Sequence, residues 1–462
     1  ASTINDIKEA LKQMLGFKNS GCYCLVNFHF FIKDPGIIQI IKDIIYKWKS
    51  SDEAGNKHLI FIENVLTIPV ELEKEITVLD YELPNKKELT DALNSVIIDD
   101  AGKLRIKKLT DAQTDKALSA ALGMTYLEAE NAYAISVIEK ETIDVSIINR
   151  EKGQILKKGG LLDFFPATET LDDVGGLDNL KDWLRKRGKA FSPEAVKFGL
   201  PSPRGILMVG IPGSGKSLCA KAVAQTWNLP LIRVDIGKAF GSLVGESESK
   251  IRSMTKQLDA MSPCVAWVDE IEKGFAGTNS SGITDSGVTM RVLGTFLTWK
   301  AECKKPVFLI ATANNVFQLP PELLRKGRFD EIFYIDLPTA AERSAIFNIH
   351  LKKRGRDPKK FDIDMLVAHS ADLVGSEIEE AIISGMYDAF DANREVTTED
   401  IVNAVKASIP LIRTMSEQVE KTRQWAQGKA RPASLADDNN VNTSRKLDVG
   451  GGTIRKGLNF KN

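Results

Sequence analysis

One short stretch constrains the fold of this chain more than any other feature. Residues 210–217 read Gly-Ile-Pro-Gly-Ser-Gly-Lys-Ser and match the pattern GxxxxGK[ST]. The apolar run 205–209 precedes this stretch, and an apolar-faced segment, 218–227, follows it. Together they predict a buried strand, a glycine-rich loop and a helix, in the order of a phosphate-binding loop. The chain is therefore expected to contain an α/β fold with a parallel sheet, of the P-loop NTPase class.

The glycine-rich loop is expected to hold ATP together with Mg²⁺. Its glycines allow backbone N–H groups to turn toward phosphate oxygens, and the helix N-terminus adds a partial positive charge. Lys216 offers a positive charge to the β- and γ-phosphates, and the Ser217 hydroxyl can bind Mg²⁺. A plain glycine turn before a helix would explain neither Lys216 nor Ser217. The residues predicted to bind nucleotide here are Gly210, Pro212, Gly213, Ser214, Gly215, Lys216, Ser217 and Leu218.

Two acidic residues follow a second apolar run, 264–268. An acid at the end of a buried strand is costly unless it meets a cation or a hydrogen-bond donor. Asp269 is placed to hold Mg²⁺ together with Ser217, and Glu270 is placed to polarise the attacking water. A pair of solvated acids at a strand end is the simpler alternative. The position of the pair downstream of the phosphate-binding loop favours the catalytic interpretation.

Polar residues after a third apolar run, 307–313, add further candidates. Asn314 carries an uncharged amide that could bond both the γ-phosphate and the attacking water, and a turn-forming asparagine is an equally good interpretation. Arg325 and Arg328 follow in the stretch 323–330. The arginine fork suits a phosphoryl group on which charge develops, so both could reach the nucleotide of a neighbouring subunit. Solvated surface arginines are the alternative.

Taken in order, these motifs resemble the AAA subgroup of the AAA+ ATPases over residues 168–410. The likeness begins at Leu-Asp-Asp-Val-Gly-Gly-Leu, residues 171–177, and reaches Gly-Ser-Glu at residues 375–377. It implies a hexameric ring in which Arg325 and Arg328 act on a neighbour. It also implies that two segments enclose the adenine, and the residues so assigned are Asp173, Gly175, Gly375 and Ser376.

A narrower likeness covers both halves of the chain. Residues 176–184 read Gly-Leu-Asp-Asn-Leu-Lys-Asp-Trp-Leu, and residues 68–76 read Ile-Pro-Val-Glu-Leu-Glu-Lys-Glu-Ile. Both phrases resemble an AAA family known from a hypothetical reading frame of plastid and cyanobacterial-type genomes. That family has no defined biochemical role. The likeness therefore implies an architecture, and it fits a plastid, bacterial or phage protein without naming a substrate.

The pattern of apolar segments divides the chain into four zones. Residues 1–160 alternate strands and amphipathic helices and predict an N-terminal α/β domain. Residues 168–338 predict the large ATPase subdomain, and residues 339–427 predict a helical lid whose first helix is capped by Thr339. Residues 428–462, rich in Gly, Asn, Asp, Lys and Arg, predict a flexible tail.

The N-terminal zone repeats part of the ATPase pattern. A buried strand, a Pro-x-Glu-Leu segment, a second short strand and a Leu-Pro exit occur at residues 59–84 and again at 307–338. Upstream, residues 23–26 parallel residues 264–268. Too few residues precede this first strand for another phosphate-binding loop. These matches predict a truncated, nucleotide-dead copy of the ATPase fold, and chance similarity between two α/β domains is the alternative.

Two loops are candidates for contact with a client protein. AAA unfoldases that thread proteins usually carry an aromatic residue just before Gly-Glu-Ser-Glu, and Leu243 occupies that position here, followed by Val244. Leucine can contact a chain through apolar burial but lacks the large flat surface of an aromatic ring. Gentle remodelling is therefore expected rather than forceful unfolding. The Gly-, Ser- and Thr-rich segment 277–287 is either a second pore loop or a surface loop.

Composition narrows the partners and the compartment. Lys and Arg number 62, as do Asp and Glu, so no net charge draws the chain to nucleic acid or to a membrane. The five cysteines form no paired motif, which fits a reducing compartment, and Cys22 and Cys24 are expected as buried strand thiols. No apolar stretch is long enough to span a bilayer. We expect a cytoplasmic protein, or one of the plastid stroma or of a phage host's cytoplasm, whose Ala1 follows a removed initiator Met.

Three functions remain open. The first is a ring of identical chains that uses ATP hydrolysis to remodel a protein client. The second is a switch in which ATP closes a ring or recruits a partner and turnover is slow. Leu243 and the incomplete N-terminal copy favour this second function. The third, a nucleic-acid motor, is disfavoured by the zero net charge and by the AAA-type motifs.

Overall fold

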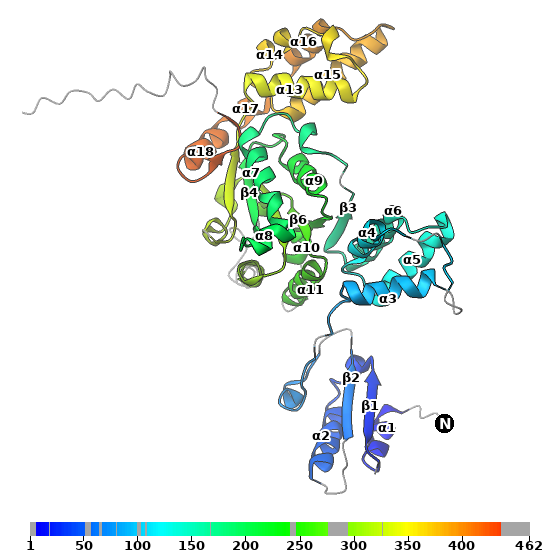
Figure 1. Cartoon of the computed structure of the whole chain (residues 1–462). Coiled ribbons are helices and arrows are strands. Elements are labelled where there is room, and N and C mark those ends of the chain that lie inside the picture. Colours follow the sequence, from blue (N-terminus) through cyan, green and yellow to red (C-terminus); the bar gives the residue numbers. More distant parts are fainter. Residues whose placement is uncertain are drawn as a thin grey trace, which may run out of the picture. The chain divides into compact units, whose positions relative to one another are not determined.

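The structure, a computed structural model, describes most of the chain. The described residues are 6–17, 19–50, 57–63, 67–79, 81–98, 103–106, 109–166, 168–240, 246–275, 294–325 and 327–435. They fall into two compact units, Ala1–Glu82 and Leu83–Asn462 (Figure 1).

A seven-stranded sheet forms the centre of the larger unit. Its strand order is β3-β5-β6-β7-β4-β8-β9, and the five strands from β5 to β8 in this order run parallel. This arrangement confirms the predicted P-loop NTPase fold. The strands span Leu162–Phe165 (β3), Gly205–Gly210 (β4), Leu231–Val234 (β5), Cys264–Val268 (β6), Val307–Ala313 (β7), Glu331–Ile335 (β8) and Arg431–Pro432 (β9).

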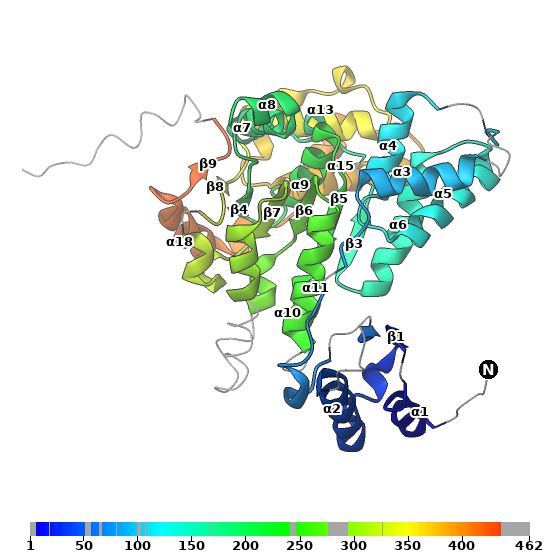
Figure 2. The same ribbon diagram turned by 60° about the horizontal axis from the view of Figure 1, so that its bottom comes forward.

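Helices cover both faces of this sheet (Figure 2). On one face the strands pack against α7 (Asp178–Gly188) and α9 (Lys216–Trp227). On the other face they pack against α11 (Glu246–Ala260) and a helical segment at 294–302. The strands β4, β6 and β7 are buried along their whole length. A parallel strand covered on both faces needs a nearly continuous run of apolar side chains, which is the pattern that the sequence shows. Shorter helices nearby are α8 (Pro193–Lys197) and α10 (Ile236–Phe240).

Both edges of the sheet come from segments outside the predicted ATPase subdomain. β3 pairs antiparallel with β5, and β9 pairs parallel with β8. Ala433, directly after β9, is fully buried, and its carbonyl accepts a hydrogen bond from the Leu180 N–H of α7 at 3.1 Å. The prediction of a flexible tail from residue 428 was therefore wrong for residues 431–433, because the strand pairing holds them in the sheet.

The helical lid has an apolar core of its own. Thr339 caps the first lid helix as predicted, since its hydroxyl accepts from the Glu342 N–H at 3.3 Å and the Glu342 carboxylate accepts from the Thr339 N–H at 2.9 Å. The chain then returns to the sheet, where Arg423 forms a bidentate ion pair with Asp336. The helices are α13 (Ala340–Lys353), α14 (Ile363–His369), α15 (Gly375–Asp391), α16 (Thr398–Ala407), α17 (Leu411–Thr414) and α18 (Ser416–Ala426).

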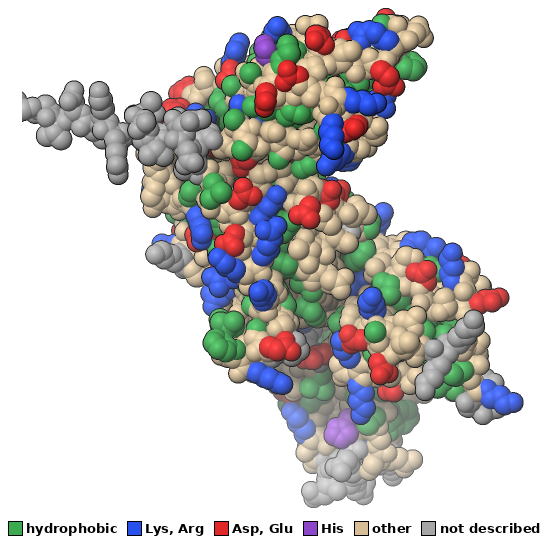
Figure 3. All heavy atoms as spheres, turned by 45° about the horizontal axis from the view of Figure 1, so that its top comes forward, with side chains coloured by type: hydrophobic (Ala, Val, Ile, Leu, Met, Phe, Trp, Pro, Cys, Tyr) green, Lys and Arg blue, Asp and Glu red, His purple; other side chains and the backbone are tan. Residues whose placement is uncertain are grey.

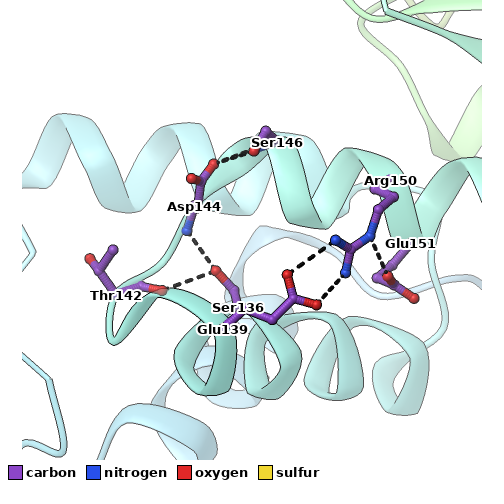
Figure 4. A network of polar contacts seen from close by, with 7 residues as sticks. All are labelled: Ser136, Glu139, Thr142, Asp144, Ser146, Arg150 and Glu151. Carbon is purple, nitrogen blue, oxygen red and sulfur yellow. Dashed lines mark hydrogen bonds and ion pairs between the residues drawn. The ribbon is translucent and has the colours of Figure 1, made fainter.

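A helical segment precedes the sheet in the sequence. It consists of α3 (Lys86–Ile97), α4 (Asp111–Ala121), α5 (Tyr126–Lys140) and α6 (Val145–Gly159), which share one apolar core. Polar contacts join α5 to α6 (Figure 4): Arg150 donates to both carboxylate oxygens of Glu139, at 3.1 and 2.7 Å, and Ser136 accepts from the Asp144 N–H at 2.7 Å. The zone predicted as one α/β domain, 1–160, thus has its strands only in its first half, as far as the described residues show.

The smaller unit is built on a two-stranded parallel sheet. β1 (Gly21–Val26) pairs with β2 (Lys57–Ile62), and α1 (Ile7–Met14) and α2 (Pro35–Ser50) supply most of its core. The prediction that Cys22 and Cys24 are buried was wrong: both are exposed, because the described helices of this unit cover one face of the sheet and both thiols lie on the other.

The smaller unit also lacks the predicted second short strand. Residues 76–79 and 81–85 form no regular structure, and the Tyr81 side chain is 97% exposed. An extended segment needs a neighbouring strand to satisfy its N–H and C=O groups, and in the described part of this unit no strand lies beside this segment.

Candidate nucleotide-binding site

The phosphate-binding loop lies where the strand order of the sheet changes direction. β4 ends at Gly210, between β7 on one side and β8 on the other, and the loop leads directly into α9. In open α/β sheets, ligands bind beyond the carboxyl ends of the strands at such a switch point. The fold therefore places the predicted loop at the position where a nucleotide site is expected.

Two glycines of the loop are required by close packing. A Cβ atom at Gly210 would come within 2.1 Å of the Ile335 carbonyl oxygen. Gly213 has a φ of +76°, and a Cβ there would come within 2.1 Å of the Ser376 hydroxyl oxygen. The Ser376 N–H also donates to the Gly213 carbonyl at 3.1 Å. The structure thus brings the predicted lid residue Ser376 onto the phosphate-binding loop.

Lys216 is buried at the base of the loop, with 6% of its surface exposed. Its ammonium donates to the carbonyl oxygens of Gly210 at 2.9 Å and of Ile211 at 2.7 Å. Burial lowers the pKa of Lys216 to about 8, and nearby carboxylates, of which Glu272 contributes most, partly offset this effect. A buried ammonium beside glycine N–H groups provides the positive charge that a triphosphate requires.

The predicted magnesium ligands lie within hydrogen-bond distance of each other. The Ser217 hydroxyl donates to the Asp269 carboxylate at 2.8 Å, across the gap between α9 and the end of β6. The Thr312 hydroxyl donates to the same carboxylate oxygen at 2.7 Å and accepts from the Glu270 N–H at 2.9 Å. One threonine therefore fixes both members of the acidic pair.

Glu270 is held by Asn314, whose amide was predicted to bond the γ-phosphate and the attacking water. The Asn314 side-chain amide donates to one Glu270 carboxylate oxygen at 2.9 Å, and the exposed Lys273 ammonium forms an ion pair with the other. Glu270 has a φ of +49°, a left-handed conformation that turns the chain sharply after the acidic pair. The carboxylate stays partly exposed, so water can reach the group predicted to polarise it.

Two residues of this cluster, Thr312 and Glu272, were not predicted. The Glu272 side chain is buried, and one of its oxygens accepts from the Asn314 N–H at 2.9 Å. Burial raises the pKa of Glu272, and its other oxygen has no hydrogen-bond partner within the described structure. The sequence held a signal for each: Thr312 is the one hydroxyl in an apolar strand, and Glu272 is a third acid, two residues after Glu270.

The segment predicted to contact adenine packs against the lid. A Cβ at Gly175 would come within 2.4 Å of an Ile346 side-chain carbon of α13, and the Leu177 N–H donates to Glu342 at 2.7 Å. Asp173 is exposed and uses its carboxylate locally, accepting from the Thr170 N–H at 2.7 Å. These hydrogen bonds lower the pKa of Asp173. The Asp173 carboxylate is therefore engaged by Thr170, and its contact with adenine stays a prediction.

Gly375, the first residue of α15 in the lid, also borders the loop. A Cβ atom at this position would lie 3.6 Å from the Gly213 carbonyl oxygen. Leu218 in the first turn of α9 is partly buried against the core of the sheet. Gly215 has a φ of +87° at the start of α9, a left-handed conformation suited to glycine. Pro212 lies earlier in the loop, in a turn with Gly213.

The two predicted arginines lie away from the loop of their own chain. Arg325 is exposed after a 3₁₀ turn at Pro321–Leu324, and Arg328 donates to the Leu297 carbonyl. Among their described contacts none is to the phosphate-binding loop. A role toward a neighbouring chain stays a prediction. Leu243, Val244 and the segment 277–287 lie outside the described residues.

The residues present fit a magnesium–nucleotide complex. The Ser214 hydroxyl is buried and has no partner in the described structure, as expected of a group that meets a ligand. The Ser217–Asp269 pair supplies oxygen ligands of the kind that Mg²⁺ prefers. The loop and the end of β6 thus combine a buried hydroxyl that has no partner among the described residues with a pair of hard-oxygen ligands.

No helix within the described ranges has the length and apolar character that crossing a membrane requires.

Three family models match separate parts of this chain. The model of the ATPase family associated with various cellular activities (AAA) matches residues 206–337. Models of the N-terminal domain and of the second domain of SpoVK-like AAA ATPases match residues 2–81 and 87–159. The boundary between these two models coincides with the boundary between the two compact units at Glu82.

Proteins of several organisms are similar to most of the chain. An uncharacterised AAA domain-containing protein called ycf46 from Guillardia theta is 40% identical over 420 residues, which cover 89% of this chain and 80% of that protein. The protein of the same name from Pyropia yezoensis is 43% identical over 423 residues, with 89% and 83% covered. A proteasome-activating nucleotidase from Saccharolobus islandicus is 26% identical over 393 residues, with 83% and 98% covered.

Proposed function

The chain belongs to the family of AAA domain-containing proteins called ycf46, and we propose that it forms a ring that couples ATP hydrolysis to the remodelling of a protein partner. The observation that carries the hydrolytic part is the cluster at the carboxyl ends of β6 and β7. There Thr312 is hydrogen-bonded to both Asp269 and Glu270, and Asn314 donates to Glu270. Asp269 also accepts from Ser217 of the phosphate-binding loop.

Each member of this cluster has a distinct task in phosphoryl transfer. Lys216 and the N–H groups of the loop neutralise the phosphates, and Ser217 with Asp269 would hold Mg²⁺, which supplies further charge neutralisation. Glu270 orients and polarises the attacking water, and its link to Asn314 places an amide beside that water. These groups act mainly by positioning and electrostatics, since phosphoryl transfer needs little covalent help from the protein.

The lid gives the chain a way to transmit the state of the site. Ser376 contacts Gly213 of the loop directly, and Val374 and Val419 form an apolar cluster with Ile211. A change in the loop would therefore move the lid and α18 together. In a ring, such a movement would alter the interface with the next subunit, where Arg325 and Arg328 are proposed to reach the nucleotide.

A protein client follows from the kind of ATPase rather than from a contact seen here. The similarity to a proteasome-activating nucleotidase supports a remodelling activity on proteins. A hexamer of identical chains, a pore lined by Leu243 and Val244, and a location in the cytoplasm or plastid stroma belong to the same proposal. Leucine at the pore position supports gentle remodelling.

One observation favours a second candidate, a slow nucleotide-dependent switch. Both carboxylate oxygens of Glu270 are engaged, one by Asn314 and one by Lys273. A base held in this way polarises water poorly until it is released, which would slow turnover. A nucleic-acid motor finds less support: Figure 3 shows acidic and basic side chains interspersed over the face in view, rather than a basic stripe.

Phosphate release by the purified full chain tests the hydrolytic part. Lys216→Ala should lower turnover by at least about 100-fold, because it removes the charge that neutralises the phosphates. Addition of an unfolding-prone protein substrate should raise the turnover of the remodeller and leave that of the switch unchanged. Turnover that survives in Lys216→Ala would contradict the assignment of the site.

Mixing two inactive variants tests the ring and the arginines. Glu270→Gln keeps its arginines, and Arg328→Ala keeps its acidic pair. If Arg328 acts across an interface, a mixture of the two variants should recover part of the activity that each lacks alone. A mixture that stays as inactive as its components would exclude this role for Arg328.

A further inference from the structure

Within the described residues of the N-terminal unit, no helix covers one face of its sheet. The two strands place three cross-strand pairs on this face, and Val26, Ile60 and Ile62 are 61%, 40% and 52% exposed. The six residues, here called the open face, are Cys22, Cys24, Val26, His58, Ile60 and Ile62. None of them is Asp, Glu, Lys or Arg, so the open face is apolar except for one imidazole.

The opposite face shows what the strands require. Tyr23 and Leu25 of β1 and Leu59 and Phe61 of β2 pack against the core formed by α1 and α2. Parallel sheets occur almost only where both faces are covered. A parallel pair with one bare apolar face is therefore an incomplete layer.

The ATPase sheet contains a counterpart of this pair with both faces covered. β6 and β7 also run parallel with a helical segment between them, and each pair is followed by a 3₁₀ turn with proline at its N-cap, Pro69 in one case and Pro320 in the other. The turn after the first strand begins near a left-handed residue in both, Asn27 and Glu270. The similarity predicted from the sequence thus extends to backbone conformation.

The second face of β6 and β7 is covered by helices. Val265 and Trp267 of β6 and Phe308 and Ile310 of β7 pack in one cluster with α9 and α7. The N-terminal unit has no counterpart of α9, because only α1 precedes β1 among its described elements and α1 packs beside α2. The missing cover is therefore a helix.

The size of the open face fits a single helix. Six residues in each of two strands make a surface about 20 Å long and about 10 Å wide. A helix is about 10 Å across, and about 13 residues span 20 Å, which is close to the 12 residues of α9. A contact of this size lies well below the roughly 800 Å² per partner of a stable interface, so this face alone binds neither a second copy nor a partner tightly, and a single helix is the unit that it can accommodate.

We propose that the open face binds an amphipathic helix of a partner protein, in the place that α9 occupies on the ATPase sheet. The occupant has a small or branched apolar stripe and carries its charges on the outward side, since the open face offers no ion-pair partner. The proposal concerns binding alone and stands whether or not the ring hydrolyses ATP.

The cysteines of the open face provide a direct readout in the full chain. Cys22 and Cys24 are exposed, whereas Cys219 and Cys264 are buried and their pKa values are raised to about 12 by burial. Iodoacetamide labelling followed by peptide mass spectrometry should modify Cys22 and Cys24 at least about tenfold faster than the buried pair. Protection of Cys22 and Cys24 at every protein concentration would show that the chain covers its own face, and protection that grows with concentration would show a second copy there. Either result would overturn the proposal.

A model helix then tests the binding. The probe is a cysteine-free amphipathic peptide of about 14 residues, made of leucine, alanine, lysine and glutamate. At about ten times its Kd it should slow the labelling of Cys22 and Cys24 about tenfold, without slowing the labelling of Cys303. A peptide of the same composition in scrambled order should give no protection.

Matched variants separate the open face from general stickiness. Ile60→Lys and Ile62→Lys place a charge on the open face and should weaken the protection at least about tenfold. Leu79→Lys alters an equally apolar side chain of the same unit that is 88% exposed, and it should keep the protection. Equal protection in all three variants, or none in the unaltered chain at millimolar peptide, would overturn the proposal.

Discussion

The two sheets of this protein contain the same structural unit, two parallel strands joined by a helical connection, but they use it for different purposes. In the ATPase sheet, β6 and β7 end in Asp269, Glu270 and Asn314, which face a phosphate-binding loop. In the N-terminal sheet, Glu63 directly follows β2; one of its carboxylate oxygens accepts from the Phe28 N–H and the other contacts the His29 imidazole, each at 2.6 Å. In both sheets an acid that follows a strand is held through both of its carboxylate oxygens, but only Glu270 lies in a cluster with the phosphate-binding loop.

This difference shows which part of the fold creates the site. A strand, a helix and a second parallel strand suffice to bring polar groups to one edge, and the N-terminal unit achieves this much. The preceding strand, loop and helix, β4 to α9, add the cradle, the buried ammonium and the cover for the second face. The described part of the N-terminal unit has no such element, and with it go the phosphate-binding loop and the helix that would cover the second face of the sheet.

Replacing one carboxylate by an amide after a strand of each sheet should give the largest difference in kcat. Glu270→Gln should lower kcat for ATP hydrolysis by about 100-fold or more, because the amide cannot act as a base, while ATP still binds. Glu63→Gln should leave kcat within about twofold and lower the free energy of unfolding of its unit by about 1–2 kcal/mol. Phosphate release and thermal unfolding of the full chain measure the two effects. Equal losses of kcat in the two variants would erase the distinction between the sheets.

The hydroxyl inside β7 gives the next largest contrast. Thr312→Val keeps the shape of the buried strand but removes the donor to Asp269 and the acceptor for the Glu270 N–H. We expect kcat to fall about 10-fold to 100-fold, with a much smaller change in nucleotide affinity. Thr312→Ser retains the hydroxyl and serves as the control. A Thr312→Val protein with unchanged kcat would show that the acidic pair is positioned without this residue.

Much of this site could be predicted from the sequence because its groups directly follow apolar strands. Asp269, Glu270 and Asn314 were recognisable in this way, as were the loop residues. Glu272 was not, because its burial depends on the left-handed turn at Glu270 that folds the chain back under the sheet. The strands β3 and β9 were missed because four residues and two residues carry too little pattern, and their pairing partners are distant in the sequence. Cys22 and Cys24 were misjudged because an apolar run does not reveal a missing cover.

Replacing one glycine by alanine in each sheet compares how tightly the two sheets are packed, with the free energy of unfolding as the measured quantity. Gly210→Ala should destabilise the larger unit by about 1–3 kcal/mol, since the new methyl group would collide with a backbone carbonyl of β8. Gly21→Ala in β1 meets no atom within 4 Å and should change the free energy of unfolding by no more than about 0.5 kcal/mol. Chemical denaturation of the full chain measures both. A larger effect at Gly21 than at Gly210 would mean that the N-terminal strand is more tightly packed than described.

The smallest expected effect concerns pH. Burial lowers the pKa of Lys216 to about 8 without nucleotide. Bound phosphate would raise this pKa, so binding should take up a proton above about pH 8, and affinity should fall by up to about tenfold for each further pH unit. Calorimetry between about pH 7.5 and 9.5, in buffers of different ionisation enthalpy, measures the proton uptake.

The stability of the nucleotide-free chain should change with pH in the opposite direction to its nucleotide affinity. The pKa of Lys216 is lower in the folded than in the unfolded chain, so this group makes the free energy of unfolding rise with pH above about 8. Affinity that does not change across this range would contradict a buried ammonium at the phosphates.

The short strand β9 has a practical consequence for work on this protein. It shields the outer side of β8 over two residues, and Asn179 of α7 anchors it by donating to the carbonyls of Pro432 and Ser434. A chain shortened before Arg431 would leave the N–H and C=O groups of β8 without partners along a sheet edge, and such edges recruit strands from other molecules. The shortened protein should therefore aggregate to the same extent with and without ATP. Sedimentation under both conditions would distinguish such aggregates from a nucleotide-dependent ring.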